Sequence, residues 1–379
     1  MIATTRRFRL LVLVLVTLAL APGLAGFWAA RAATGSSPFG EGDLAPAPLR
    51  EGNGGEDAGA VAPAPPVVRL ASGPPPGFLV IGHMGAPNEE VENTIPSFQK
   101  ALDLGANAIE TDLCLTKDGV VVHWHDWSPN DLIAKFRQLG QQGLKYRPYN
   151  PNLLSKWRRK VCQLTLAELR KHYGYTRRGN PLGTSSRSAT PINTLAEVAA
   201  WARQEPRLQK IFLDVKIPKD GERFVAPLMR SALAILRRNG LEEKTIFMVA
   251  NENIARLVQA ALAGSSAGLT FDRELVPGII IHPGKFSAVK NALALQVPYA
   301  SVGKPVATLL GWTIYRRIVA NDLQALAAHN ARRPAVPLRG YFPWTIDDPT
   351  EMKTLIEMGV HGIITNHPER LHALVAQEP

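Results

Sequence analysis

From residue 78 onward, short apolar runs alternate with amphipathic segments. The first run, residues 78–81, ends in a glycine and is typical of a buried strand. Repeated strand and helix units predict a parallel sheet covered by helices, and their number suits a closed (β/α)8 TIM barrel. A doubly wound open sheet is the alternative, although no glycine-rich phosphate-binding turn follows the first strand. Further strands are expected at 108–115, 120–124, 211–217, 245–250, 267–271, 279–282 or 299–302, 340–345 and 362–365, and helices at 94–104, 223–238, 253–263 and 349–358.

Two stretches do not fit this alternation of strand and helix patterns. Residues 127–190 follow the second strand without regular alternation, so we expect an insertion on the rim of a barrel domain that spans residues 78–379. Residues 35–77 are rich in Pro, Gly and Ala and hold very few aromatic or β-branched side chains. That composition predicts a disordered linker.

The first 34 residues have the layout of an export signal. Arg6, Arg7 and Arg9 precede an apolar run at residues 10–21, and the small residues on either side of Arg31 offer a cleavage site. Counted through residue 30, the apolar stretch reaches about 20 residues, which is long enough for a single retained anchor. The adjacent arginines also weakly resemble a twin-arginine signal. We therefore expect residues 1–34 to be a signal peptide or membrane anchor, and the protein to be exported to the periplasm or the extracellular space.

The composition predicts a globular body of enzyme size. Hydrophobic residues make up 46% and charged residues 20%, which excludes a chain disordered throughout and a multi-span membrane protein. The net charge of +11 is concentrated in residues 127–190, which carry 13 Lys and Arg against two acids, together with Trp127, Tyr146, Tyr149 and Tyr173. This segment is either a solvated basic cap or a surface for anionic membranes. Nucleic acid is not expected as a partner, because an exported chain rarely meets it and no nucleic-acid-binding motif is present.

The chain has only two cysteines, which cannot form a disulfide scaffold. An oxidising compartment would permit a bond between Cys114 and Cys162. Two independent thiols are the preferred interpretation, and neither has the neighbours of a thiolate nucleophile.

Acidic side chains recur on two predicted strands. Glu110 and Asp112 stand at i and i+2, so they share one face, and their apolar neighbours imply burial. Asp214 and Lys216 repeat this spacing on a later strand. Buried like charges are costly unless a cation lies between them, and Mg²⁺ and Ca²⁺ prefer carboxylate oxygens. The pattern indicates a metal site with a lysine for an anionic substrate; solvated strand-end acids and a structural Asp–Lys ion pair are the simpler alternatives.

His83 and His125 lie at the ends of predicted strands, and Gly82 and Gly85 around His83 leave room for a ligand. Two histidines beside three carboxylates can supply a general acid and a general base near neutral pH. A single histidine is more often a packing residue. Because His123 shares a strand face with His125, a histidine metal site at this H-x-H pair is a rival interpretation.

These residues belong to an ordered set of motifs that resembles the signature of glycerophosphodiester phosphodiesterases, G-H-R-G-A, E-N-T, E-x-D, D-G and H-D. Five ordered motifs so close together do not arise readily by chance, and the similarity extends to about residue 372. In this chain the motifs are Gly82-His83-Met84-Gly85-Ala86, Glu92-Asn93-Thr94, Glu110-Thr111-Asp112, Asp118-Gly119 and His125-Asp126.

The resemblance implies a TIM barrel with a rim insertion after the second strand. It also implies divalent-cation-assisted hydrolysis of glycerophosphodiesters to an alcohol and glycerol 3-phosphate. Whether water or the substrate's glycerol 2-hydroxyl attacks stays open. Carried over residue by residue, it implies that Glu110, Asp112 and Asp214 hold Mg²⁺ or Ca²⁺, that His83 and His125 are the catalytic acid and base, and that Lys216 steadies the phosphate. Asn93 and Trp344 are further candidates for binding the substrate, Trp344 as an apolar wall; a core residue is the alternative for a tryptophan on a late strand.

Three departures from the family pattern leave alternatives open. Met84 stands where Arg is usual, so one phosphate-binding guanidinium is missing, and Lys216 or a cation of residues 127–190 is the candidate replacement. Asp214 replaces a Glu, and Asn366-His367 replaces an acid and an aromatic residue. The alternatives are a lysophospholipase D or phospholipase-C-like enzyme acting on membrane lipids, and a catalytically impaired barrel that binds anionic lipid.

Overall fold

The computed structural model describes residues 73–132, 134–135, 144–177, 186–273, 286–304 and 311–376. The predicted signal or anchor, the linker up to residue 72 and the strand candidate at 279–282 lie outside the described residues. No helix in these ranges is long and apolar enough to cross a bilayer.

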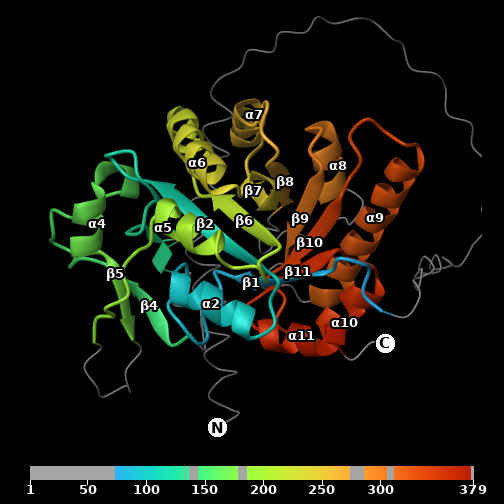
Figure 1. The fold of residues 1–379 in the computed structure, drawn as a ribbon, viewed down its shortest axis with the longest axis horizontal. Helices are drawn as coiled ribbons and strands as arrows, with labels where there is room; N and C mark the ends of the chain where they lie inside the picture. The colour runs from blue at the N-terminus through green and yellow to red at the C-terminus, as the bar shows by residue number, and fades with distance from the viewer. Residues whose placement is uncertain are drawn as a thin grey trace, which may run out of the picture. The chain divides into compact units, whose positions relative to one another are not determined.

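Eight parallel strands in the described ranges curl into a nearly closed barrel (Figure 1). Their spatial order is β10-β9-β8-β7-β6-β2-β1-β11. Backbone hydrogen bonds from His361 to Tyr341, at 3.2 Å, and from Ile346 to Ile364, at 3.1 Å, link the two outer strands, β10 and β11. The predicted TIM barrel is confirmed. The strands are β1 (Leu79–His83), β2 (Ala108–Leu115), β6 (Lys210–Val215), β7 (Thr245–Val249), β8 (Gly268–Arg273), β9 (Tyr299–Gly303), β10 (Gly340–Trp344) and β11 (Gly362–Thr365).

Helices follow the strands and cover the outside of the barrel (Figure 1). Local sequence sets their ends: Thr194 and Glu197 form a capping box at the start of α5, and Gly240, with a φ of 66°, ends α6. Asp348 caps α10 through its carboxylate. The covering helices are α2 (Ile95–Asp103), α5 (Leu195–Ala202), α6 (Val225–Asn239), α7 (Glu252–Ala261), α8 (Ala288–Ala294), α9 (Gly311–Ala331), α10 (Pro349–Glu357) and α11 (Pro368–Ala376).

Strand alternation divides the buried side chains into two cores. The larger core lies between the strands and the helices, and the smaller one fills the barrel. The inward positions become polar toward the carboxyl ends of the strands. There the register places His83 opposite Glu110 and Asp112 opposite Asp214. The smaller core consists of Leu79, Ile81, Ala108, Phe212, Ile246, Met248, Phe342 and Ile364.

The predicted rim insertion is present between β2 and β6. It follows the short antiparallel strand β3 (Val121–His123) and contains β4 (Tyr146–Tyr149), η1 (Val161–Gln163), α4 (Leu166–His172) and β5 (Gly174–Arg177). Lys145 pairs with Glu89 after β1 at 2.6 Å, and the ring of Trp127 lies 5.1 Å from that of Phe224 after β6. Both contacts follow the carboxyl ends of strands, so the insertion stands on the rim that bears the polar residues.

Candidate active site

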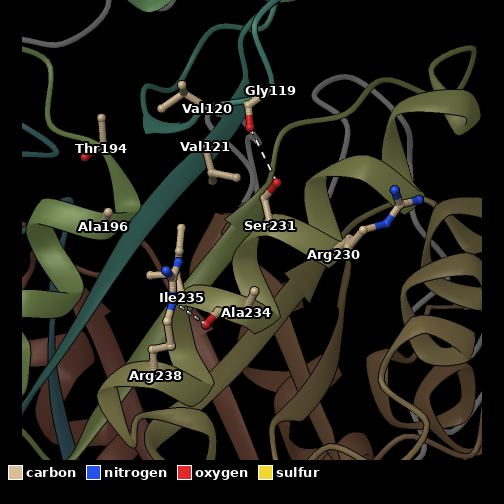
Figure 2. A pocket seen from close by; sticks show the side chains of 10 residues that line it. All are labelled: Gly119, Val120, Val121, Thr194, Ala196, Arg230, Ser231, Ala234, Ile235 and Arg238. Carbon is tan, nitrogen blue, oxygen red and sulfur yellow. Dashed lines mark hydrogen bonds between the residues drawn. The ribbon is translucent and has the colours of Figure 1, made fainter.

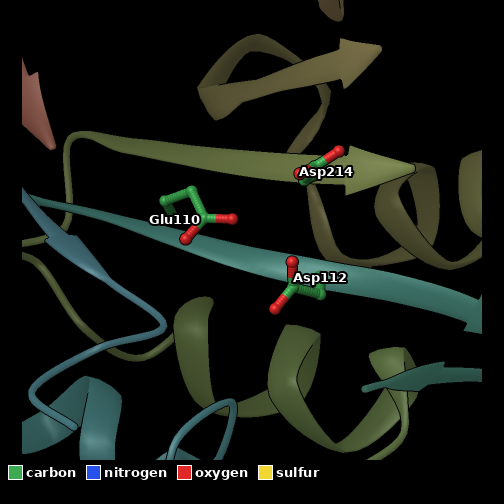
Figure 3. Close-up of side chains that lie close together, drawn as sticks. All are labelled: Glu110, Asp112 and Asp214. Carbon is green, nitrogen blue, oxygen red and sulfur yellow. The ribbon is translucent and has the colours of Figure 1, made fainter. Parts of the chain in front are cut away.

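Three carboxylates of β2 and β6 converge (Figure 3). Glu110, Asp112 and Asp214 each offer an oxygen within 4.8 Å of the others. Glu110 and Asp112 are buried, and Asp214 is partly buried. The two-residue period of β2 and the Asp112–Asp214 register bring them together. The sequence prediction placed these three residues together, and the structure does so.

Lys216 is the cation of this cluster. Its Nζ lies 3.0 Å from Asp112 Oδ1 and also donates to Asp214 Oδ2. Burial opposes its charge, but Asp112 and Asp214 outweigh that effect and raise the pKa of Lys216 well above its usual range. The lysine is therefore a fixed positive charge beside the carboxylates.

Glu110 and Asp112 differ in their environments although they lie on one strand face. Burial, followed by the charges of Asp112 and Asp214, raises the pKa of Glu110 well above its usual range. Burial would also raise the pKa of Asp112, but Lys216, His125 and a hydrogen bond from Asn93 outweigh it and lower that pKa. Of these two carboxyls, Glu110 is thus the one whose charged form is opposed by its surroundings.

The cluster fits a divalent cation by charge and by donor type. Three carboxylates against the single ammonium of Lys216 leave two formal negative charges. Hard divalent ions bind several oxygen ligands, and one oxygen of each carboxylate lies within 4.8 Å of the other two. Glu110, Asp112 and Asp214 are accordingly the residues that would hold such an ion.

Asn93 supports the carboxylates from the loop before α2. Its Nδ2 donates to Asp112 Oδ2 at 2.7 Å, and its Oδ1 accepts from Thr111 Oγ1 at 2.8 Å and from the Asp112 N–H at 3.0 Å. The side chain is fully buried. This geometry supports a role in orienting Asp112, whereas the sequence predicted contact with substrate.

His83 is held in one tautomer. Its Nδ1 lies 2.7 Å from Asn366 Oδ1, and Asn366 Nδ2 donates to Asp347 Oδ2 at 2.9 Å, which fixes the amide orientation. Because a carbonyl oxygen only accepts, Nδ1 carries the proton, and Nε2 faces Glu110 Oε2 at 3.9 Å. Burial lowers the pKa of His83 despite the hydrogen bond to Asn366, which raises it.

The second histidine, His125, follows β3. Its Nδ1 lies 2.7 Å from Asp126 Oδ1, so the neighbouring carboxylate orients the ring. Both His83 and His125 lower the pKa of Asp112, so both rings lie close to the carboxylate cluster.

His123 does not join His125 in a site. It pairs with Leu113 of β2, and its Nδ1 contacts Thr111 Oγ1 at 2.7 Å. Residues opposite each other in a sheet share a face, and Leu113 and Thr111 alternate with Glu110 and Asp112, so His123 faces the helices. The H-x-H metal site considered from the sequence is therefore wrong. Strand β3 ends at His123, so the alternation of side chains between the two faces does not extend to His125.

Met84 supplies a backbone group where the family pattern has a guanidinium. Its N–H donates to Glu110 Oε2 at 3.0 Å, and its side chain is 2% exposed. In the described part of the chain, Lys216 is the cation that contacts the carboxylates.

Trp344 lies at the mouth of the barrel, against Gly303 of β9. A Cβ at Gly303 would stand 2.8 Å from its ring, so the glycine is needed for this approach. Its Nε1–H donates to the buried carboxyl of Asp272 on β8, which also accepts from Ser301 Oγ at 2.7 Å. Burial and the charge of Asp214 raise the pKa of Asp272 to about 7. Sequence reasoning missed Asp272, Ser301, Asp347 and the role of Asn366.

A separate hollow of about 410 Å³ lies on the outside of the barrel (Figure 2). Its lining contains no acid, histidine or cysteine, and shares no residue with the carboxylate cluster. This hollow is therefore separate from the carboxylate cluster. The lining residues are Gly119, Val120, Val121, Thr194, Ala196, Arg230, Ser231, Ala234, Ile235 and Arg238.

Both cysteines are free thiols in the structure. Cys114 is buried, and burial raises the pKa of its thiol well above the usual range. The thiol of Cys114 donates to the carbonyl of Trp124 at 3.2 Å.

Clustered carboxylates, a lysine and two histidines at the carboxyl-end mouth of a TIM barrel are an arrangement typical of hydrolases. The model of the glycerophosphoryl diester phosphodiesterase family matches residues 83–370. The chain belongs to this family of enzymes, as its motifs indicated.

Individual relatives agree with this assignment. A glycerophosphodiester phosphodiesterase of Caldanaerobacter subterraneus is 26% identical over 297 residues, which cover 78% of this chain and 97% of the relative. A solved glycerophosphodiester phosphodiesterase of Parabacteroides distasonis has a TM-score of 0.52 and 18% identity, and covers 79% of this chain and 97% of its own. A phosphodiesterase of Oleispira antarctica, solved with its product sn-glycerol-3-phosphate, has a TM-score of 0.52 and 16% identity, with coverages of 78% and 96%. The two structures share the fold of this chain.

Proposed function

We propose that this protein hydrolyses glycerophosphodiesters to an alcohol and glycerol 3-phosphate, assisted by Mg²⁺ or Ca²⁺. The observation that carries the proposal is the convergence of Glu110, Asp112 and Asp214 beside Lys216. Family membership and the product complex of the Oleispira protein support the substrate class.

Each group at the mouth has a distinct role in this proposal. A bound divalent ion would polarise the phosphodiester and neutralise developing negative charge. Lys216 contributes a second positive charge for the phosphate oxygens. One of His83 and His125 accepts the proton of the attacking hydroxyl, and the other protonates the leaving alkoxide. Asn366 and Asp126 hold the two rings, and the Trp344 ring forms an apolar wall for the glycerol or the leaving group.

The test of the histidine roles compares glycerol 3-phosphate release by the wild type with that by His83→Ala and His125→Ala. We expect each variant to lose at least ~100-fold in kcat, the usual contribution of a general acid or base. Retained turnover in both variants would contradict the proposed roles. Binding of lipid with no turnover in the wild type would instead support the catalytically impaired barrel.

A second candidate function is hydrolysis of membrane lipids, as a lysophospholipase D or a phospholipase-C-like enzyme. Two exposed leucines, Leu153 and Leu154, favour it, and both lie in the basic segment 127–190. We propose that this segment binds an anionic membrane. Faster release from vesicle-borne lysophospholipid than from soluble glycerophosphoethanolamine would favour the lipid substrate.

We also propose that the protein is exported and that residues 1–34 are either removed or kept as an anchor. Fractionation of cells, followed by the mass of the intact protein, tests both. A cytoplasmic protein with its first 34 residues present would contradict export.

A further inference from the structure

Two leucines stand at the tip of a tight turn in the rim insertion. The N–H of Ser155 donates to the carbonyl of Asn152 at 2.9 Å, so Leu153 and Leu154 are the central residues of the turn. Leu153 is 75% exposed and Leu154 is 100% exposed. Turn tips usually carry Gly, Pro, Asn, Asp or Ser, and an apolar pair there contributes nothing to the core.

The turn is held firmly by its neighbours. Arg158 Nη1 donates to the carbonyl of Pro151 at 2.8 Å, and Asn150 Nδ2 donates to the carbonyl of Pro129 at 3.0 Å. Pro151 is buried. The leucines are therefore presented to solvent by an anchored loop.

Cations follow the leucines directly. Lys156, Arg159 and Lys160 are exposed, and Lys156 Nζ and the Arg159 guanidinium lie 5.4 and 5.9 Å from the centroid of the Trp157 ring. Within the described ranges, no carboxylate oxygen lies within 4.0 Å of the basic groups of Lys156, Arg159 or Lys160. Their charges remain available to an anionic partner.

Exposed apolar side chains gather in this part of the molecule. Of the six large hydrophobic residues exposed in the described ranges, four belong to the insertion: Leu132, Tyr149, Leu153 and Leu154. The insertion stands on the barrel rim through the contacts of Lys145 with Glu89 and of Trp127 with Phe224. A partner bound there would lie on the same rim as the carboxylate site.

We propose that residues 152–160 form a membrane-docking turn for an anionic lipid bilayer. Leu153 and Leu154 enter the boundary between headgroups and acyl chains, and Lys156, Arg159 and Lys160 meet the lipid phosphates. The long basic side chains can bury their methylene groups while their charges stay at the headgroups. This docking surface does not depend on the proposed reaction.

The test places an environment-sensitive fluorophore at the tip of the turn, in the full chain. Leu154→Cys is labelled with NBD in a Cys162→Ser background, because the other thiol, Cys114, is buried. Leu257→Cys is the matched control, since Leu257 is 42% exposed on α7 and lies outside the insertion. Phosphatidylcholine vesicles with and without phosphatidylglycerol are then added.

We expect a blue shift and increased emission at position 154 with phosphatidylglycerol vesicles, and neither change at position 257. Replacing Lys156, Arg159 and Lys160 by Gln should raise the vesicle concentration that gives half of the maximal emission change by about 10-fold or more. Each cation near an anionic surface increases the membrane affinity by about a factor of 5.

Vesicle binding through residues 1–34 alone would sediment the protein without changing the signal at position 154, and would overturn the proposal. Equal signals at both positions, or an equal response to soluble heparin, would overturn it as well. Turnover of soluble glycerophosphoethanolamine by the same labelled proteins shows separately whether the proposed reaction holds.

Discussion

The indole Nε1–H of Trp344 donates a hydrogen bond to the buried carboxyl of Asp272. The two residues lie on β10 and β8, and Ser301 of the intervening strand β9 donates to the same carboxyl oxygen at 2.7 Å. One acceptor on β8 thus holds side chains of the next two strands, β9 and β10. Because the Trp344 ring is the proposed wall of the substrate site, Asp272 sets the orientation of that wall.

Removing this acceptor should weaken substrate binding more than the chemical step. We expect Asp272→Ala to raise KM by about 5-fold or more while kcat changes less. The indole N–H and the Ser301 hydroxyl lose their buried acceptor, which costs about 1–3 kcal/mol and leaves the Trp344 ring without the contact that orients it. Steady-state kinetics with glycerophosphoethanolamine measures both constants. Asp272→Asn is the control, because it keeps an oxygen acceptor; if it behaves like Asp272→Ala, the wall does not depend on this hydrogen bond.

The hydrogen bond between Asn366 and His83 should matter for turnover. Asn366→Ala leaves Nδ1 without the acceptor that sets the tautomer, so we expect kcat to fall by about 10-fold or more with little change in KM. Asn239→Ala, at the end of α6, removes a comparable side-chain hydrogen bond far from the site and should leave kcat unchanged. Equal kcat in the wild type and Asn366→Ala would show that His83 needs no such support.

The buried His123 should make the fold sensitive to mild acid. Burial lowers its pKa from 6.5 to about 3, so below pH 6.5 the unfolded chain binds a proton that the folded chain does not. Stability therefore decreases as the pH falls from 6.5 toward 3, by up to about 1.4 kcal/mol per pH unit from this group.

Urea unfolding at pH 7 and pH 5 measures this effect. Relative to His123→Gln, the wild type should lose about 1–2 kcal/mol more of its unfolding free energy between the two values. Gln has no titrating group and keeps an N–H donor for the hydroxyl oxygen of Thr111, whose proton goes to Asn93 Oδ1. Parallel losses in both proteins would mean that His123 is protonated in the folded state.

Glu110 should determine the response to metal without supporting the metal-free fold. Burial and the charges of Asp112 and Asp214 raise its pKa well above the usual range and so oppose its charged form without a metal, and Glu110→Gln should therefore unfold at nearly the wild-type temperature. Mg²⁺ or Ca²⁺ at ~100 times its Kd should raise Tm by about 5 °C or more in the wild type, and much less in the variant. Thermal unfolding with and without chelator measures both. An equal metal response in the two proteins would exclude Glu110 as a ligand.

The carboxylate cluster could be predicted because its geometry is mostly local. Glu110 and Asp112 need only the two-residue period of one strand, and Asp214 and Lys216 repeat it. The motif order then placed both strands in one barrel. What remained was the register between β2 and β6, which puts Asp112 opposite Asp214.

The supporting residues could not be predicted in the same way. Asp272 and Asn366 reach Trp344 and His83 through barrel closure, across sequence separations of 72 and 283 residues. No spacing rule encodes such contacts. His123 was assigned the face of His125 because the end of β3 is set by pairing with β2, which the sequence does not state. The exposure of Leu153 and Leu154 likewise depends on a turn, and the basic composition on which the interpretation of this segment was based does not predict that turn.

The proposed phosphodiester hydrolysis depends on a divalent ion held by Glu110, Asp112 and Asp214. The most direct measurement is glycerol 3-phosphate release from glycerophosphoethanolamine by the full chain, with Mg²⁺ or Ca²⁺ and with excess chelator. We predict release that the chelator abolishes and that either Mg²⁺ or Ca²⁺ restores. Release at an unchanged rate in chelator would show that the reaction needs no divalent ion at these carboxylates.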